Sequence, residues 1–309
     1  MKTINGISQF TYTAIQTAIT IGTFDGVHLG HRKILERLIN NAKDVGLKST
    51  VLTFFPHPRM VLQKDTDIKL LNTLEEKVQI LDSLGLDYLI VHPFTKDFSR
   101  LSATGFVRDI LVNGLKSKKV IIGYDHRFGR NRNANIQDLI AFGNTLDFEV
   151  EEIPAQEIDE VSVSSTKIRN ALLDGDITTA NTYLNYPYML TGIIKKGKGL
   201  GKQFGFPTAN LHIAEDYKLI PKNGVYVVKS IINGKAYYGM MNIGFNPTVA
   251  GTEKSIEVNF FKFEGNLYNK KIQVAILHRI RDEHKFDSVE ELKKQLQRDR
   301  EKSLELIAK

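Results

Sequence analysis

The chain contains no cysteine among its 309 residues. This absence excludes disulfides, thiolate metal ligands and cysteine nucleophiles, and it agrees with a reducing compartment. The sequence also has no apolar run near the ~20 residues that a membrane-spanning helix requires, and its first residues lack the apolar segment of a signal peptide. We therefore expect a cytoplasmic protein that does not contact a membrane.

Acidic residues are the second shortage, with 35 of them against 42 basic ones and a formal net charge of +7. Such an excess suits a polyanionic partner, either a nucleic acid or a small phosphorylated molecule. A nucleic-acid-binding module is therefore one alternative, and steeply salt-dependent binding would support it. No stripe of basic and aromatic residues accompanies the charge, and we favour small molecules as partners, without nucleic acid.

The chain is organised around the stretch 22–31, which reads GTFDGVHLGH. A short β-branched run, 18–21, precedes it and predicts a buried strand. Apolar residues recur at helical spacing over 32–42 and predict a helix. The stretch is thus a glycine-rich turn before a helix N-terminus, where exposed N–H groups favour bound phosphate. His28 and His31 lie three residues apart, so both imidazoles can face the same anion.

The first part of the chain alternates predicted strands with predicted helices. This alternation indicates βαβ crossovers and a mostly parallel, Rossmann-like sheet in a domain of residues 1–185. Ligands of such sheets bind beyond the carboxyl ends of the strands. The further predicted strands are 49–55, 88–91, 119–122 and 148–153, and the further predicted helices are 106–112, 136–146 and one that opens with a capping box at Thr73.

Three loops of this domain carry residues suited to an anionic or planar ligand. They are TFFPHP at 53–58, GYDHRFGRNR at 123–132 and VSSTKIR at 163–169. Arginine offers forked donors for phosphate in the second loop. In the third, serine and threonine hydroxyls either cap a helix or, with Lys167 and Arg169, hold phosphates.

Beyond residue 185 the pattern changes to strands without intervening helices. They are predicted at 188–194, 225–232, 236–243, 256–263 and 272–277. Asn233 and Gly234 have the chemistry of a two-residue hairpin turn, and a capping box at Ser288 opens a final helix. We expect a small antiparallel β-barrel with a terminal helix over residues 186–309.

A basic, glycine-rich segment, KKGKGLGKQFGFPTAN at 195–210, opens this second domain. No predicted helix follows its glycines, so it does not match a dinucleotide fingerprint, and a phosphate loop fits better. Thr208 and Asn210 share a face of an extended segment. Their oxygens are hard ligands suited to Mg²⁺.

These motifs together resemble those of the bacterial bifunctional riboflavin kinase/FAD synthetases. The string at 22–31 matches G-x-F-D-G-x-H-x-G-H, residues 164–169 match S-S-T-x-I-R, and residues 205–210 match G-F-P-T-A-N. The resemblance covers nearly the whole chain and implies two reactions. Riboflavin is phosphorylated by ATP to FMN, and FMN is then adenylylated by a second ATP to FAD with release of pyrophosphate. FMN and FAD are products or substrates, and Mg²⁺ accompanies ATP.

The resemblance also implies which residues act. The catalytic residues are Glu257 as general base, His28, His31 and Arg169. The residues that bind ATP or phosphate are Gly22, Phe24, Asp25, Gly30, Ser164, Ser165, Thr166, Gly197, Lys202 and Gly205. The flavin-binding residues are Pro56, His57, Pro58, Asp125, Arg127, Phe128, Arg279 and Arg281, and the metal ligands are Thr208 and Asn210.

The chain departs from the family pattern at three positions. His126 stands where the family usually has phenylalanine, Asn246 where many members have arginine, and Asn259 where many have histidine. Flavin affinity can therefore differ from that of relatives. A second alternative is an adenylyltransferase with another phosphate acceptor, against which the P-T-A-N segment argues. We favour a monomer.

Overall fold

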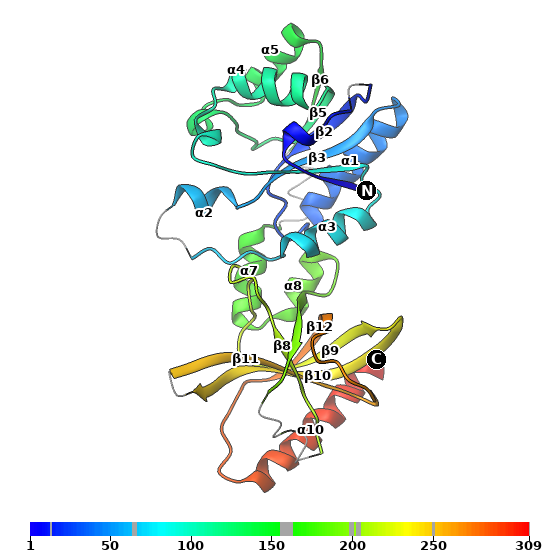
Figure 1. Cartoon of the computed structure of the whole chain (residues 1–309), viewed down its shortest axis with the longest axis vertical. Coiled ribbons are helices and arrows are strands. Elements are labelled where there is room, and N and C mark those ends of the chain that lie inside the picture. Colours follow the sequence, from blue (N-terminus) through cyan, green and yellow to red (C-terminus); the bar gives the residue numbers. More distant parts are fainter. Residues whose placement is uncertain are drawn as a thin grey trace. The chain divides into compact units, whose positions relative to one another are not determined.

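The structure is a computed structural model that describes residues 1–12, 14–63, 67–154, 163–197, 201, 205–248 and 251–308. Two compact units make up the chain, Met1–Ser164 and Ser165–Lys309. Figure 1 shows the helices and strands of each. The predicted fold class is confirmed in both: a parallel sheet with helices in the first, and a closed barrel followed by a helix in the second.

The N-terminal unit is built on a six-stranded sheet with the order β1-β4-β3-β2-β5-β6. The strands are β1 (Lys2–Asn5), β2 (Thr17–Ile21), β3 (Lys48–Phe54), β4 (Tyr88–His92), β5 (Ser117–Gly123) and β6 (Glu149–Ile153). All neighbouring strands pair in parallel. After β2 the chain builds one side of the sheet through β3 and β4, and β5 returns to the other side. This reversal makes the carboxyl end of β2 the place where such sheets bind ligands.

Helices connect these strands. They are α1 (Leu29–Asp44), α2 (Pro58–Leu62), α3 (Leu74–Ser83), α4 (Ala103–Gly105) and α5 (Ile136–Leu146). Apolar periodicity or capping signals predicted α1, α3 and α5 among them, but not α2 or α4. The predicted helix 106–112 is a π-helical segment, Phe106–Gly114, that continues α4. The N–H of Leu115 reaches the carbonyl of Ile110 at 2.9 Å. Apolar spacing over two turns does not distinguish this winding from an α-helix, so the sequence analysis missed it.

Helices α7 (Ser165–Asp174) and α8 (Ile177–Leu184) belong to the C-terminal unit. Asn181 in α8 explains part of this attachment. Its side-chain nitrogen donates to the carbonyl of Ile276 at 2.9 Å, and its oxygen accepts from the N–H of Tyr188 at 2.7 Å. The compact units therefore divide after Ser164. The division of the two activities at residue 185 stays a prediction.

The C-terminal unit is a closed barrel with the strand order β10-β11-β8-β7-β12-β9. Its elements are β7 (Met189–Lys195), β8 (Ala209–His212), β9 (Gly224–Ile232), β10 (Lys235–Thr248), β11 (Gly251–Phe260), β12 (Lys271–Arg281) and the terminal helix α10 (Val289–Ala308). Asn233 and Gly234 have φ of 51° and 78°, as the predicted hairpin turn requires. Strand β11 ends before the predicted residue 263, because Lys262 turns the chain with a φ of 55°.

Candidate active sites

The chain leaves β2 through the turn 22–28, and α1 begins at Leu29. Three turn residues have positive φ: Phe24 at 46°, Gly26 at 89° and Val27 at 38°. Phe24 and Val27 are buried, and their packing holds this strained backbone in place. A Cβ on Gly22 would lie 3.0 Å from the Phe24 ring, so glycine lets that ring pack. The turn thus sets the helix N-terminus at the ligand-binding edge of the sheet.

His28 and His31 lie against each other at this helix start. Nδ1 of His28 accepts the N–H of His31 at 3.3 Å, and the two rings stack with their centroids 3.6 Å apart. Burial lowers the pKa of His31 well below its usual value, and positive charge on His28 and Lys77 lowers that pKa further. The described residues give Nδ1 of His31 no hydrogen-bond partner. His31 is thus a half-buried imidazole that its lowered pKa keeps neutral at pH 7, with a buried Nδ1 that has no partner among the described residues.

Asp25 is predicted to contact phosphate, and the structure shows a role inside the protein. Its carboxylate accepts the N–H groups of Leu71 at 2.9 Å and Asn72 at 3.5 Å, and the side chain is buried. Asp25 therefore ties the turn to the segment before α3. Gly30 is buried in the first turn of α1. For both residues, contact with ATP stays a prediction.

The predicted flavin loop Pro56–Pro58 follows β3 directly, at the same edge of the sheet. His57 caps α2, with its Nδ1 accepting the N–H of Arg59 at 3.2 Å. The peptide bond between Phe55 and Pro56 is cis. The loop is joined to the end of β4 because the N–H of Phe55 donates to the carbonyl of His92 at 3.1 Å.

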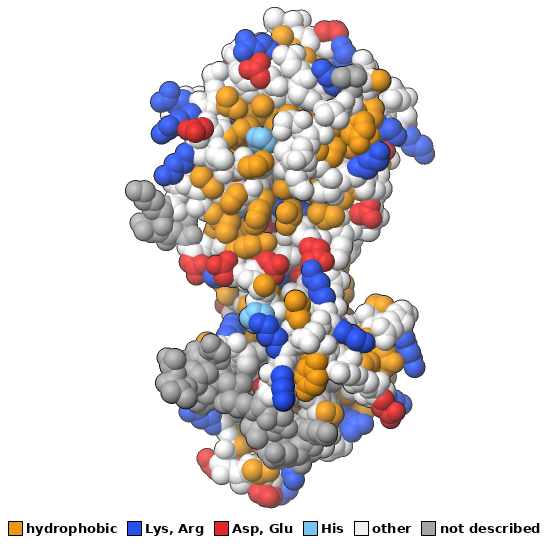
Figure 2. Space-filling view, in the orientation of Figure 1, with side chains coloured by type: hydrophobic (Ala, Val, Ile, Leu, Met, Phe, Trp, Pro, Cys, Tyr) orange, Lys and Arg blue, Asp and Glu red, His pale blue; other side chains and the backbone are white. Residues whose placement is uncertain are grey.

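An aromatic cluster that the sequence analysis missed lies beside this loop. The Phe54 ring is 5.6 Å from Phe94 and 5.4 Å from Phe98. Phe98 lies 4.6 Å from His92 and 6.2 Å from Phe106. Figure 2 shows hydrophobic side chains gathered on one face of this unit. The signal was present as phenylalanines that follow two strand ends, but nothing in their spacing distinguishes a ligand surface from core.

The loop after β5 places its predicted flavin residues differently. Phe128 is 6% exposed, and its ring lies 5.9 Å from Phe106, whereas Asp125 and Arg127 are exposed. Burial lowers the pKa of His126 to about 4, and the described residues give its Nε2 no partner. The structure therefore joins Phe128 to the aromatic cluster. Flavin contact by any of these residues stays a prediction.

The serine-rich signature lies where the two units divide. Ser164 is the last residue of the first unit, and Ser165 opens both the second unit and α7. Thr166 is exposed and Arg169 is half-buried. Ile168 between them is buried and fixes the helix face. Phosphate contact by these hydroxyls and by Arg169 stays a prediction.

In the barrel, the structure brings the predicted kinase residues together. Strand β11 places Glu257 directly opposite Asn210 of β8 on one side and Asn242 of β10 on the other. The hydroxyl of Thr208 donates to the Glu257 carboxylate at 3.0 Å. The base candidate and both metal-ligand candidates thus share one patch, although 47 positions separate Asn210 from Glu257 in the sequence.

Asn259 supports this patch and was not predicted to do so. Its side-chain nitrogen donates to the carbonyl of Pro207 at 2.7 Å, next to Thr208, and the side chain is 8% exposed.

The predicted phosphate-binding glycines lie close to this patch or in its loop. Gly197 lies against Asn210, and a Cβ on Gly197 would overlap the Asn210 amide. Gly205 needs its glycine for a φ of 82°. Lys202 and the side chain of Asn246 lie outside the described residues.

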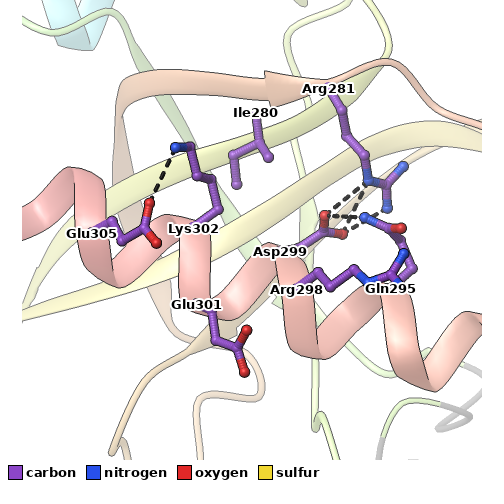
Figure 3. A pocket seen from close by; sticks show the side chains of 8 residues that line it. All are labelled: Ile280, Arg281, Gln295, Arg298, Asp299, Glu301, Lys302 and Glu305. Atoms are coloured by element: carbon purple, nitrogen blue, oxygen red, sulfur yellow. Dashed lines mark hydrogen bonds and ion pairs between the residues drawn. The ribbon is translucent and has the colours of Figure 1, made fainter.

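Arg281 and Arg279, both predicted to bind flavin, are held by protein carboxylates. Nε and Nη2 of Arg281 donate to Asp299 on α10 at 2.9 and 2.7 Å, and Gln295 donates to the same carboxylate at 2.8 Å. Figure 3 shows this network in a groove between α10 and β12. Arg279 donates to Asp282 at 2.6 Å and to the carbonyl of Asn223 at 3.0 Å. Both guanidinium groups are thus paired within the protein, and flavin contact by them stays a prediction.

The donor set around Glu257 fits Mg²⁺ bound together with ATP. Thr208 uses its proton toward Glu257, so its oxygen lone pairs stay available. Hydroxyl, amide and carboxylate oxygens are the hard ligands that this cation prefers. Over the described residues, no cluster of three or more His, Asp or Glu side chains could hold a metal by itself. Among the helices of the described residues, none is long and apolar enough to cross a membrane.

Fold and candidate sites together define a class: an enzyme with two units, one built on a Rossmann-like parallel sheet and the other on a closed β-barrel. The comparisons make this specific. Residues 11–167 match the family model described as FAD synthetase, and residues 184–307 match the one described as riboflavin kinase. The chain belongs to the family of bifunctional riboflavin kinase/FMN adenylyltransferases.

Three proteins with that name show the extent of the similarity. The one from Listeria monocytogenes is 38% identical, covering 100% of this chain and 99% of the relative. Those from Bacillus subtilis and Escherichia coli K12 are each 35% identical, covering 94% and 97% of this chain and 92% and 96% of theirs. The similarity to all three thus extends over both units of this chain.

A solved structure from Streptococcus pneumoniae, described as a macrolide-efflux protein, is also similar. It has a TM-score of 0.87 and 32% identity, covering 97% of this chain and 98% of that one. The similarity shows that the folds agree over nearly the full length.

Proposed function

We propose that the two activities of this family are divided between the two units. Adenylylation of FMN would occur at the turn after β2, and phosphorylation of riboflavin on β8 and β11. The observation that carries the proposal is the Glu257 patch, because Thr208 lies 3.0 Å from that carboxylate and Asn210 faces it across the strands. Membership of this family favours FMN over another phosphate acceptor as the substrate that is adenylylated.

In the kinase step, Glu257 accepts the proton of the ribityl 5′-hydroxyl. The freed oxygen attacks the γ-phosphorus of ATP, a new P–O bond forms, and ADP leaves with the electrons of the broken one. Thr208 fixes the orientation of the carboxylate by its hydrogen bond. Positioning of this kind and charge neutralisation supply most of the catalysis in phosphoryl transfer. FMN is released as the product.

We assign Mg²⁺ to Thr208 and Asn210, together with the ATP phosphates. When bound, the ion neutralises charge on the transferring phosphate. Asn259 holds Pro207 and thereby fixes the segment that carries both ligands.

In the adenylylation step, a phosphate oxygen of FMN attacks the α-phosphorus of ATP and pyrophosphate leaves. His28 and His31 donate hydrogen bonds to phosphate oxygens in the transition state. His31 does so as a neutral imidazole, because burial lowers its pKa. Ser164, Ser165, Thr166 and Arg169 are assigned to the triphosphate on the resemblance of their signature.

The aromatic cluster is the surface that we assign to the flavin ring of FMN. Phe54, Phe94 and Phe98 lie within 5.8 Å of one another by ring centroid, and rings of this kind bind planar aromatic ligands by stacking or edge contacts. The Pro56–Pro58 loop adjoins the cluster.

We further propose that the enzyme acts as a cytoplasmic monomer on riboflavin, FMN and ATP, without a nucleic acid or membrane partner.

The test is the substitution Glu257→Gln, assayed by chromatography of flavins. The change keeps size and hydrogen bonding but removes the base, so riboflavin phosphorylation falls by about 10²–10⁴-fold. Conversion of FMN to FAD by the same variant provides the control and stays at the wild-type rate. Retention of wild-type riboflavin phosphorylation would refute the role of Glu257.

A further inference from the structure

Lys77 in α3 is a buried lysine beneath the turn that follows β2. The residue is 6% exposed, and its Nζ donates to the carbonyl of Thr23 at 2.6 Å. Among the described residues this carbonyl is its only hydrogen-bond partner. An ammonium group has three N–H donors, and burying it with one partner is unfavourable. The Asp25 carboxylate in the turn opposes this effect, yet burial still lowers the pKa of Lys77 below its usual value. Fold stability alone would therefore favour an apolar residue at such a place.

The carbonyl of Thr23 is held from two sides. Besides Lys77, the hydroxyl of Thr53 at the end of β3 donates to it at 3.3 Å. The carbonyl and the next N–H of a planar trans peptide point in opposite directions. With the Thr23 carbonyl held toward Lys77 and Thr53, the N–H of Phe24 therefore points away from them. The described residues give this N–H no hydrogen-bond partner.

Helix α3 is itself fixed where it meets the turn. A complete capping box joins Thr73 and Glu76, with contacts of 2.9 and 3.2 Å. The carboxylate of Asp25 in the turn accepts the N–H of Leu71 at 2.9 Å, just before the helix. The turn is thus joined to α3 at two points, once through Asp25 and once through Lys77. Of these two contacts, only the one through Lys77 acts on the Thr23–Phe24 peptide, whose N–H has no partner among the described residues.

We propose that Lys77 is a positioning residue for adenylyl transfer. It orients the Thr23–Phe24 peptide so that the Phe24 N–H donates to an ATP phosphate, and it adds a buried positive charge beneath that phosphate. The proposal rests on adenylylation at this turn. A polyanion offsets the unfavourable burial of the ammonium, which accounts for lysine at a position where stability favours an apolar residue.

The absence of cysteine from the chain permits a chemical test at one atom. Lys77→Cys provides a single thiol, which is alkylated in denaturant with bromoethylamine and refolded. The product restores an ammonium at nearly the length of lysine. Alkylation with iodoacetamide gives a neutral control of similar size, and wild-type protein taken through the same steps measures losses from refolding.

The expected result is a split between turnover and binding. The neutral form loses at least tenfold in kcat for FMN adenylylation, while its KM for FMN stays within twofold, and the aminoethyl form recovers most of the loss. Riboflavin kinase activity is the same in all forms. Equal kcat for the two alkylated forms would overturn the proposal. Failure of the wild-type chain to adenylylate FMN would instead refute the proposed function.

A second variant decides the question if the neutral form does not fold. Thr53→Val keeps the shape of the side chain and leaves Lys77 in place, but it removes the other donor to the Thr23 carbonyl. It lowers kcat for adenylylation at least threefold with an unchanged KM for FMN. A wild-type kcat in this variant would also overturn the proposal, because the orientation of the peptide would then not matter.

Discussion

An ion pair with a buried carboxylate joins β12 to the terminal helix α10, and a single substitution tests how much it contributes to stability. Asp299 is 1% exposed, and Arg281 donates to both of its oxygens, at 2.9 and 2.7 Å. Asp299→Asn removes the negative charge and leaves a partly buried guanidinium uncompensated. Loss of one partner of a buried pair costs about 3–5 kcal/mol. We take about 3 kcal/mol, because 19% of the Arg281 side chain is exposed.

This loss corresponds to a fall of about 6–12 °C in the Tm of the C-terminal unit. Differential scanning calorimetry measures it, and the thermal half-life of riboflavin kinase activity gives an independent readout. Glu305→Gln on the same helix is the matched control. It removes an ion pair with Lys302 whose side chains are 63% and 55% exposed, and such pairs contribute about 0–1 kcal/mol. A fall in Tm no larger than that of the control would refute the anchoring role of Asp299.

Two further predictions concern positions where the chain departs from its family. Asn259→Ala removes the hydrogen bond to the Pro207 carbonyl and lowers kcat/KM of riboflavin phosphorylation about tenfold. FMN adenylylation by the same variant is the internal control, and an unchanged kcat/KM of phosphorylation would contradict this prediction. His126 has a pKa of about 4 when folded and about 6.5 when unfolded, so the unfolded state binds more protons and stability falls as the pH drops below about 6.5. Between pH 7 and pH 5, His126→Phe should therefore reduce the loss of unfolding free energy of the N-terminal unit by about 2 kcal/mol in urea titrations, and equal losses in both proteins would contradict the burial of His126.

The fold was predictable where apolar periodicity and turn chemistry agree. Helix 136–146 and the Asn233–Gly234 hairpin are confirmed as predicted, because each has a local signal that tertiary contacts do not override. The π-helical segment was not predictable, since its apolar spacing also fits an α-helix. Strand β8 was missed because its four residues are too few for a periodic signal.

The candidate sites were predictable as motifs but not as geometry. The sequence marks Glu257, Thr208 and Asn210 separately, and only strand pairing shows that they lie together. Lys77 gave no signal, because a lysine in the first turn of an amphipathic helix is usually exposed. Its burial depends on where α3 meets the turn after β2, which is a property of the packed unit.

The central claim is that one chain carries two separate active sites, and a mixing experiment tests it most directly. Glu257→Gln and His31→Ala are each incubated with riboflavin, ATP and Mg²⁺, alone and combined, and the flavins are separated by chromatography. The account predicts unreacted riboflavin for the first variant, FMN for the second and FAD for the mixture. Absence of FAD from the mixture, with each variant keeping its own remaining activity, would contradict independent sites.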